Sequence, residues 1–308
     1  THPASDPLKP SERYYLFSMM PLADYLIAVG AVGEIIQTGS RTQPQVLRNK
    51  PAAQEMAALI LMSDHDLFVG DNGLWIEDLS ATTIEELRLR TLARAPVWKT
   101  TRYRPWAKAR LKESMPSCRN VLAYLAIPVS RMEGHPLGPR LIHETLLEFS
   151  SVAARDLIFS GLGYLPHNHG APWEGYGENP VIHETLVRTD THEGLPLLFA
   201  WSLTTVDESL RYHCRQELTT WGKENPGEFL KLLKRTYPTD DLQMKEELVI
   251  VAAGIACLFA PEEGAPLAAL ARWALAEIFD DGEIQKVQNI VIRHMGRIIV
   301  ERAFYHGL

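Results

Sequence analysis

The pentapeptide Ile-His-Glu-Thr-Leu occurs twice in this chain of 308 residues, at Ile142–Leu146 and at Ile182–Leu186. The two copies are 40 residues apart, and the same offset aligns Leu157–Phe159 with Leu197–Phe199. A period of this size is typical of stacked helical hairpins, so the repetition constrains the architecture before it says anything about a reaction. A match of five residues also arises by coincidence in a chain of this length, and the sequence leaves both interpretations open.

Segments with helical periodicity follow one another along most of the chain. They cover residues 51–63, 80–94, 141–149, 152–165, 195–203, 226–237, 246–259, 266–279 and 283–305. A strand signal occurs only at 66–78, where two apolar triplets flank the turn dipeptide Asn72-Gly73. The sequence therefore predicts an all-α fold with one small β-hairpin near residues 66–78.

A long apolar run near the N-terminus, from Tyr14 to Ile36, predicts a further helix. Pro21 is expected to interrupt it, because proline lacks the backbone N–H and crowds the preceding turn. Gly30 and Gly33 are compatible with a nucleotide-binding turn, but the full GxGxxG pattern is absent. Close helix packing at these small residues is the favoured interpretation.

The segment Ala154–Gly163 resembles the second helix of a HEAT repeat. It reads Ala-Arg-Asp-Leu-Ile-Phe-Ser-Gly-Leu-Gly, with the Arg followed by small residues and a final Leu-Gly. Glu247–Cys257 shows a weaker form of the pattern, and the resemblance extends over residues 120–280. It implies a HEAT-like helical-hairpin solenoid that binds proteins or nucleic acids on a concave face, with an irregular helical array as the alternative. Two regions are expected: an N-terminal helical region (1–119) with the hairpin and a basic segment, and a HEAT-like repeat region (120–308).

Positive charge is concentrated between Arg88 and Arg119. This segment holds ten basic residues and a single acid, so it carries +9 in a chain whose net charge is −7. Basic and aromatic residues alternate there, which suits phosphate contacts and base stacking. The candidate nucleic-acid-binding residues are Arg102, Arg104, Trp106, Lys108 and Arg110. In the alternative interpretation the aromatic rings anchor the segment to the core and the charges face water or the acidic remainder.

Histidines gather in and after a Gly/Pro-rich segment at residues 166–180. His167, His169 and His183 are candidate metal ligands, because two imidazoles and a carboxylate can complete a zinc or iron site. The chain has no HExxH motif, and His-Asn-His between prolines is more typical of a polar surface loop. His143 and His183 are expected at equivalent, partly exposed helix positions without a ligand. No cofactor is expected.

Three dispersed cysteines are typical of a reducing compartment, and a cytoplasmic location is expected. The apolar runs are too short for a transmembrane helix, so no membrane partner is expected. The favoured function is a non-enzymatic helical scaffold that binds a protein partner within a larger assembly. The alternative is a nucleic-acid-binding module that uses residues 88–119. A metal-dependent hydrolase centred on residues 167–193 is the third hypothesis.

Overall fold

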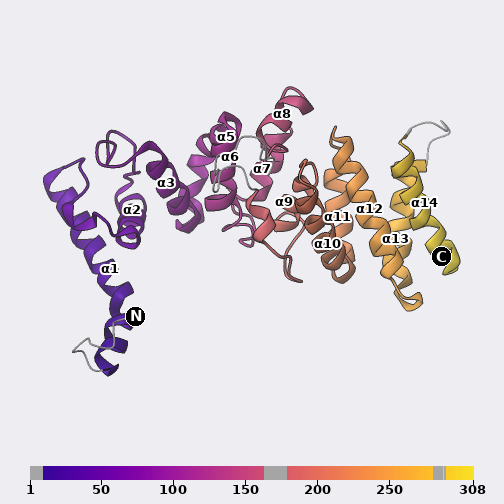
Figure 1. Ribbon diagram of the computed structural model, residues 1–308, viewed down its shortest axis with the longest axis horizontal. Helices are drawn as coiled ribbons and strands as arrows, with labels where there is room; N and C mark the ends of the chain where they lie inside the picture. Colours follow the sequence, from indigo (N-terminus) through magenta and orange to yellow (C-terminus); the bar gives the residue numbers. More distant parts are fainter. Residues whose placement is uncertain (1–9, 163–178, 280–286, 288) are drawn as a thin grey trace, which may run out of the picture. The chain divides into compact units, whose positions relative to one another are not determined.

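The computed structural model describes residues 10–162, 179–279, 287 and 289–308, with side chains from Pro21 onward. Every regular element within these ranges is helical, which confirms the predicted all-α class (Figure 1). The chain packs into two units, Thr1–Thr100 and Thr101–Leu308. The sequence placed a boundary between residues 119 and 120, a position that lies inside helix α6 of the second unit.

The first unit consists of helices packed around a small apolar core. Its elements are α1 (Pro10–Thr38), η1 (Gln45–Leu47), α2 (Pro51–His65), α3 (Ala81–Arg94) and α4 (Val97–Thr100). Helix α2 contacts both α1 and α3. The core contains Ala31 and Val32 of α1, Ala57 of α2, and Trp75 of the connecting segment.

Local signals explain where two of these helices start. Helix α2 has proline at its first position, where the missing N–H would be unpaired in any residue. Ser80 caps α3, because its Oγ accepts a hydrogen bond from the backbone N–H of Thr83 at 3.1 Å. Helix α1, in contrast, continues through Pro21, so the predicted interruption is wrong.

The predicted β-hairpin at residues 66–78 is also wrong, because the segment forms consecutive turns. Most of its backbone hydrogen bonds join residues close in the chain: the Asp71 N–H donates to the Phe68 carbonyl and the Leu74 N–H to the Asp71 carbonyl, both at 2.9 Å. Asn72 and Trp75 have positive φ values of 50° and 62°, which curl the backbone away from an extended path.

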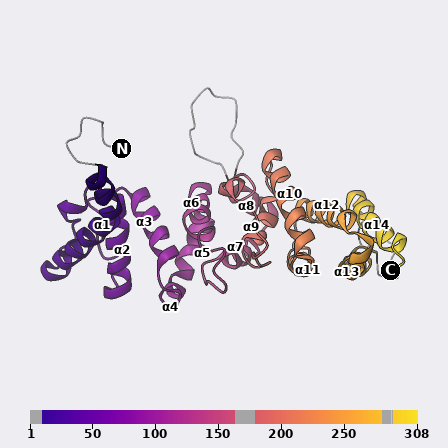
Figure 2. The ribbon, with the colours of Figure 1, turned by 90° about the horizontal axis from the view of Figure 1, so that it is seen from below.

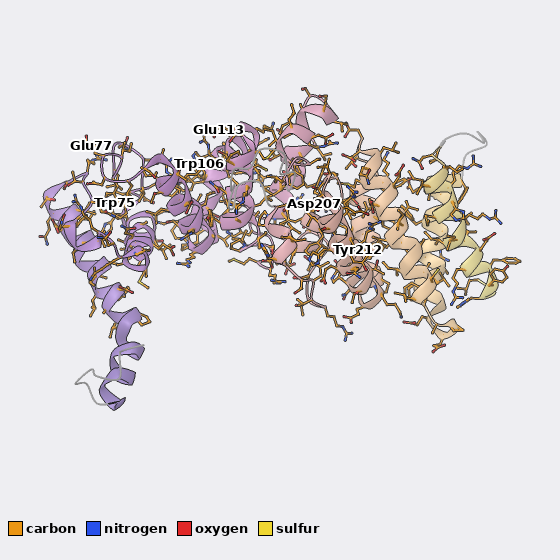
Figure 3. All side chains as sticks on the ribbon, in the orientation of Figure 1. Trp75, Glu77, Trp106, Glu113, Asp207 and Tyr212 are labelled. Atoms are coloured by element: carbon orange, nitrogen blue, oxygen red, sulfur yellow. The ribbon has the colours of Figure 1, made fainter. Side chains whose placement is uncertain are left out.

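Burial explains why a ribbon does not form in this segment. Adjacent residues Phe68 and Val69 are both buried, and so are Leu74 and Trp75. Successive side chains of a strand point to opposite faces, so a two-stranded hairpin would leave one residue of each pair in water. The turns let both residues of each pair reach the core, while Glu77 stays exposed (Trp75 and Glu77 are labelled in Figure 3).

The second unit is a longer succession of helices. They are α5 (Arg104–Glu113), α6 (Met115–Val121), α7 (Pro139–Leu146), α8 (Val152–Ile158), α9 (Leu195–Ser202), α10 (Glu208–Glu224), α11 (Pro226–Thr236), α12 (Leu242–Leu258), α13 (Gly264–Ala274) and α14 (Ile290–Tyr305). The odd-numbered helices α5 to α13 contact one another in chain order, and α10, α12 and α14 do the same (Figure 2). Neighbours in the chain, such as α9 with α10 and α13 with α14, also contact each other.

From α7 to α12 the helix starts alternate between two types. Helices α7, α9 and α11 carry proline in their first two positions and have no side-chain cap. Helices α8, α10, α12 and α14 begin after a side chain that accepts a hydrogen bond from the first turn, namely that of Ser151, Asp207, Asp241 and Asn289. A proline in the first turn and a capping side chain both favour the beginning of a helix at that point. Local residues therefore explain where these helices begin.

The two copies of the pentapeptide adopt different structures. Ile142–Leu146 lies in helix α7. The second copy begins in the 3₁₀ turn η4 (Pro180–His183) and continues without helix from Glu184. His143 is buried, whereas His183 is exposed, so the expected equivalence of the two histidines is wrong. The identical residues therefore have no common structure, because the backbone becomes extended at Glu184 (ψ 155°), whereas Glu144 lies within helix α7.

A buried polar network joins four parts of the second unit. Arg155 of α8 is 2% exposed, and its guanidinium donates to Asp240 at 2.9 Å and to Asp241 at 3.0 Å, just before α12. The guanidinium carbon also lies 5.2 Å from the ring centroid of Trp201 on α9. The Trp201 Nε1–H donates to Nδ1 of His143 on α7 at 3.0 Å. Residues more than 80 positions apart are therefore held together by charge-assisted hydrogen bonds.

Replacing Arg155 with Met is expected to destabilise the second unit by about 3–5 kcal/mol, because the substitution leaves the Asp241 carboxylate buried without a positive charge beside it. The side chain of Asp241 is only 4% exposed. Urea denaturation followed by circular dichroism measures the loss. The double variant Arg155→Met/Asp241→Asn should recover most of the lost unfolding free energy, since Asn removes the charge and still caps a helix.

Arg297→Met is the matched control, because Arg297 is an exposed arginine paired with Glu301 on its own helix. We expect this substitution to change the unfolding free energy by less than about 1 kcal/mol. Equal effects of Arg155→Met and Arg297→Met would contradict a structural role for the buried network.

Candidate functional site

An open pocket of about 520 Å³ lies in the second unit. The loops that precede α7 and α9 form two of its walls, and the first turns of α11 contribute Glu228 and Lys231. Arg104, at the start of α5, reaches the same space. The volume of the pocket is within the usual range for ligand pockets, and its walls come from α5, α7 and α11 and from the loops that precede α7 and α9.

Hydrogen bonds centred on the buried side chain of Asp190 fix the loops that form the pocket. Arg131 donates through Nε to the carboxylate of Asp190 at 3.0 Å and through Nη2 to the Thr185 carbonyl at 2.8 Å. The Asp190 side chain is only 1% exposed and also accepts from the Val187 N–H at 2.8 Å. The Trp221 Nε1–H donates to the Asp190 carbonyl at 3.1 Å. Asp190 therefore connects both loops to helix α10, and these hydrogen bonds fix the positions of the loops around the pocket.

Gly194 allows the two loops to approach each other. A Cβ atom at this position would lie 2.5 Å from the carbonyl oxygen of Ser130, closer than side-chain carbons ever come. Only glycine therefore fits between the loop before α7 and the start of α9.

Glu228 is the most perturbed acid in the pocket wall. Burial raises its pKa, but hydrogen bonds from Lys231 at 2.6 Å and from the ring and backbone of His192 lower it more strongly, to about 2. The distance from His192 Nδ1 to the Glu228 carboxylate is 2.8 Å. Glu228 also lies in the first turn of α11, where the helix dipole favours a negative charge. Its carboxylate is therefore ionised and held by three donors.

Charges of both signs line the pocket. The cations are Arg104, Arg131, Arg140 and Lys231, and the carboxylates are Glu133, Glu144, Asp190, Glu193 and Glu228. Arg140 and Arg104 share the carboxylate of Glu144. Such a surface presents donors and acceptors side by side, which suits a polar segment of mixed charge better than a simple anion or cation.

Two further lining residues bear on the chemistry. The Ser130 hydroxyl donates to the Ile127 carbonyl at 2.7 Å, so its proton is engaged within its own turn. His135 accepts at Nδ1 from the Leu137 N–H at 3.2 Å, and burial lowers the pKa of its ring. The neutral ring then carries its proton on Nε2, which has no hydrogen-bond partner among the described atoms. Neither contact activates the Ser130 hydroxyl as a nucleophile, and both groups remain hydrogen-bonding groups of the pocket wall.

Helix α5 carries most of the residues predicted to bind nucleic acid. Arg104 pairs with Glu144 of α7 and donates to the Pro136 carbonyl at 2.8 Å. Lys108 pairs with Glu148, the second acid that faces α5. Arg110 pairs with Glu113 at 2.5 Å within the helix, and Trp106 is half-buried. The structure thus brings these cations to acids of the second unit.

Arg102 precedes this helix on the 3₁₀ turn η2 (Thr101–Tyr103) and is exposed. Its guanidinium carbon lies 4.9 Å from the ring centroid of Tyr103, and its Nη2 donates to the Tyr103 hydroxyl at 3.0 Å. It therefore differs from the other four predicted residues, which are half-buried.

The part of the basic segment that lies in the first unit is paired in the same way. Arg90 and Arg94 of α3 contact Glu55 of α2 at 2.7 and 2.6 Å. Lys99 pairs with Asp66 at 3.2 Å, and Arg88 pairs with Asp71. With Lys112 paired to Glu148, at least eight of the ten basic residues from Arg88 to Arg119 have an acidic partner within the described part of the chain. The sequence of the segment alone did not show these partners.

The predicted metal ligands are mostly outside the part of the chain that is described. His167 and His169 lie outside the described residues, and His183 is exposed on η4. Within the described ranges no three histidines, cysteines or acids come close enough to hold a metal ion. In the same ranges no helix has both the length and the apolarity to cross a bilayer.

Sequence reasoning did not identify the pocket, although a signal was present. Gly138-Pro139 and Gly194-Leu195-Pro196 each start a helix after a polar segment that contains both an arginine and a glutamate. No known family model matches this chain, and no curated protein or solved structure matches it. The site is therefore interpreted from its own geometry.

The low pKa of Glu228 predicts a specific contribution to acid stability. A depressed pKa stabilises the folded state above the ordinary value near 4.5, and this contribution is lost as the pH falls toward 2. Glu228→Gln lacks the titrating group, so the wild-type advantage in unfolding free energy, at most about 3 kcal/mol, should shrink between pH 6 and pH 2.5. Urea denaturation at several pH values measures it.

Glu301→Gln, which changes an exposed acid on α14, is the control and should show little change with pH. A wild-type advantage over Glu228→Gln that stays constant across this pH range would contradict the low pKa of Glu228.

Proposed function

We propose that this chain is a non-enzymatic, HEAT-like helical scaffold that binds a protein partner. The observation that carries the proposal is the packing order of the second unit. Odd-numbered helices contact one another in succession, later even-numbered helices do the same, and from α7 to α12 the two types of helix start alternate. This order is what stacked helical hairpins require, because each hairpin buries its apolar face against its neighbours.

The pocket supports binding of an extended segment of the partner. In helical solenoids the loops at one edge repeat along the array, so a partner segment contacts several of them in turn. The pocket joins the loops before α7 and α9 to the start of α11, and its charges are of both signs. A polar peptide segment with acidic and basic residues is the matching partner chemistry.

Nucleic-acid binding by residues 88–119 is the alternative. Trp98 favours it, because its side chain is 74% exposed and Lys99 lies 5.0 Å from the ring centroid. The ion pairs disfavour it, because each phosphate contact would first have to displace a carboxylate from its arginine or lysine. We therefore place it second, and a metal-dependent hydrolase centred on residues 167–193 has no support among the described residues.

Reversing one charge in the pocket should abolish partner capture. Arg140 lies on α7 and is exposed at the pocket wall, so Arg140→Glu should repel the acidic groups of a bound segment without unfolding the chain. Immobilised full-length chain is used for affinity capture from the source cell, followed by quantitative mass spectrometry. A specific protein should be enriched by the wild type and fall at least about tenfold with Arg140→Glu.

The matched control is Arg297→Glu, since Arg297 is an arginine paired with the acid four residues later, as Arg140 is, and has similar exposure. Capture by this variant should equal that of the wild type. If no protein is enriched, or if both variants capture it equally, the pocket is not the binding surface.

The same proposal predicts weak binding of nucleic acids. Because the basic residues are already paired, short single- and double-stranded probes should bind with apparent Kd values weaker than about 10⁻⁴ M at physiological salt. Fluorescence anisotropy measures this. Micromolar binding that weakens steeply with salt, and is lost when Arg102 and Trp98 are replaced by Ala, would favour the alternative function.

A further inference from the structure

Most carboxylates of the pocket wall are engaged within the chain itself. Glu144, Asp190 and Glu228 each accept hydrogen bonds through both carboxylate oxygens. Glu193 is bound through one oxygen by Arg235. Carboxylates outnumber the Lys and Arg side chains of the wall by five to four, yet a bound molecule finds few acceptors that are not already occupied.

Glu133 is the acid of the wall with both oxygens available. It lies in the loop before α7, is exposed, and makes no hydrogen bond or ion pair with another described residue. A carboxylate in this condition binds Lys or Arg through charge-assisted hydrogen bonds. Glu133 is therefore the acceptor that the pocket offers to a positively charged group.

The most exposed cations of the wall are Arg140 and Lys231, each with 60% of its side chain exposed. A guanidinium has five N–H groups, and Arg140 uses the one on Nε, which donates to Glu144 at 3.1 Å. An ammonium group has three, and Lys231 donates one of them to Glu228 at 2.6 Å. Among the described residues the other N–H groups of both side chains have no acceptor, so they are available to a negatively charged group.

Helix dipoles add to these donors. Helices α7 and α9 begin at the pocket without a side-chain cap and without an acid in their first turns. Helix α11, in contrast, has Glu228 in its first turn. The positive ends of α7 and α9 therefore favour a carboxylate from the bound molecule, as the positive end of α11 favours Glu228.

We propose that the pocket recognises one carboxylate and one cation of a bound segment at two separate places. The carboxylate, from Asp, Glu or a C-terminus, accepts hydrogen bonds from Arg140 and Lys231. The cation, from Lys or Arg, donates to Glu133. The inference rests on the proposed scaffold function and specifies which charges of the partner segment the pocket selects.

An array of random peptides with amidated C-termini, probed with the labelled full-length chain, tests the inference. Thr191→Trp identifies the peptides that use the pocket, because Thr191 lines the pocket and an indole there fills it without changing its charge. Peptides that bind the wild type at least about tenfold more tightly than Thr191→Trp should be enriched, relative to the whole array, in both acidic and basic residues.

Two sets of substitutions separate the two places. Arg140→Gln/Lys231→Gln should remove the enrichment of acidic residues and keep that of basic residues. Glu133→Gln should do the reverse, so each variant is the control for the other. For a single peptide, replacing its Glu with Gln should weaken binding to the wild type about tenfold and hardly change binding to Arg140→Gln/Lys231→Gln.

These variants should remain folded. Without Arg140 and Lys231, Glu144 still pairs with Arg104, and Glu228 still pairs with His192. Lys234→Gln is the matched control for the loss of an exposed lysine from α11, because Lys234 is exposed and does not line the pocket. It should alter neither enrichment.

The outcomes distinguish this inference from the scaffold function on which it rests. If pocket-dependent peptides show no enrichment of acids, or keep it in Arg140→Gln/Lys231→Gln, the proposed carboxylate contact is wrong although the pocket still binds a segment. Basic residues whose enrichment persists in Glu133→Gln contradict the cation contact in the same way. If no peptide distinguishes the wild type from Thr191→Trp, the pocket binds no segment, and the proposed function fails at this surface as well.

Discussion

The Arg155 guanidinium is the interaction on which the second unit depends most. It is a charge with almost no access to water, and it is tolerated because Asp240, Asp241 and the face of Trp201 surround it. Asp241 at the same time accepts a hydrogen bond from the Met244 N–H and so begins α12. The same carboxylate therefore caps α12 and neutralises Arg155. Neither α8 nor α12 can shift without breaking these contacts.

Trp201 carries this constraint to the neighbouring helices. Its indole N–H donates to His143, whose pKa is lowered to about 4 mainly by burial. The ring is therefore neutral near pH 7 and can accept the bond at Nδ1. Helix α7, which carries His143, also supplies Pro139 and Arg140 to the pocket wall. The polar network of Arg155, Trp201 and His143 that holds the helices together therefore also fixes the helix that forms part of the pocket wall.

The starts of helices were predictable from the local sequence. Ion pairs between residues far apart in the chain were not. Proline and serine at the starts of α2 and α3 predicted those helices correctly. The Asn72-Gly73 dipeptide predicted a hairpin, but burial of adjacent apolar residues outweighed it. Arg104 appeared to be a free charge because its partner Glu144 lies 40 positions away. Partners at that distance are set by packing, which short motifs do not encode.

Pairing of the basic segment has a consequence for the electric field around the chain. The +9 of residues 88–119 lies against acids, so at distances beyond a few ångströms it contributes little as a separate positive pole. The field that an approaching molecule meets is then governed by the overall excess of acid. Encounter rates should rise for basic partners and fall for polyanions, before any contact at the pocket is made.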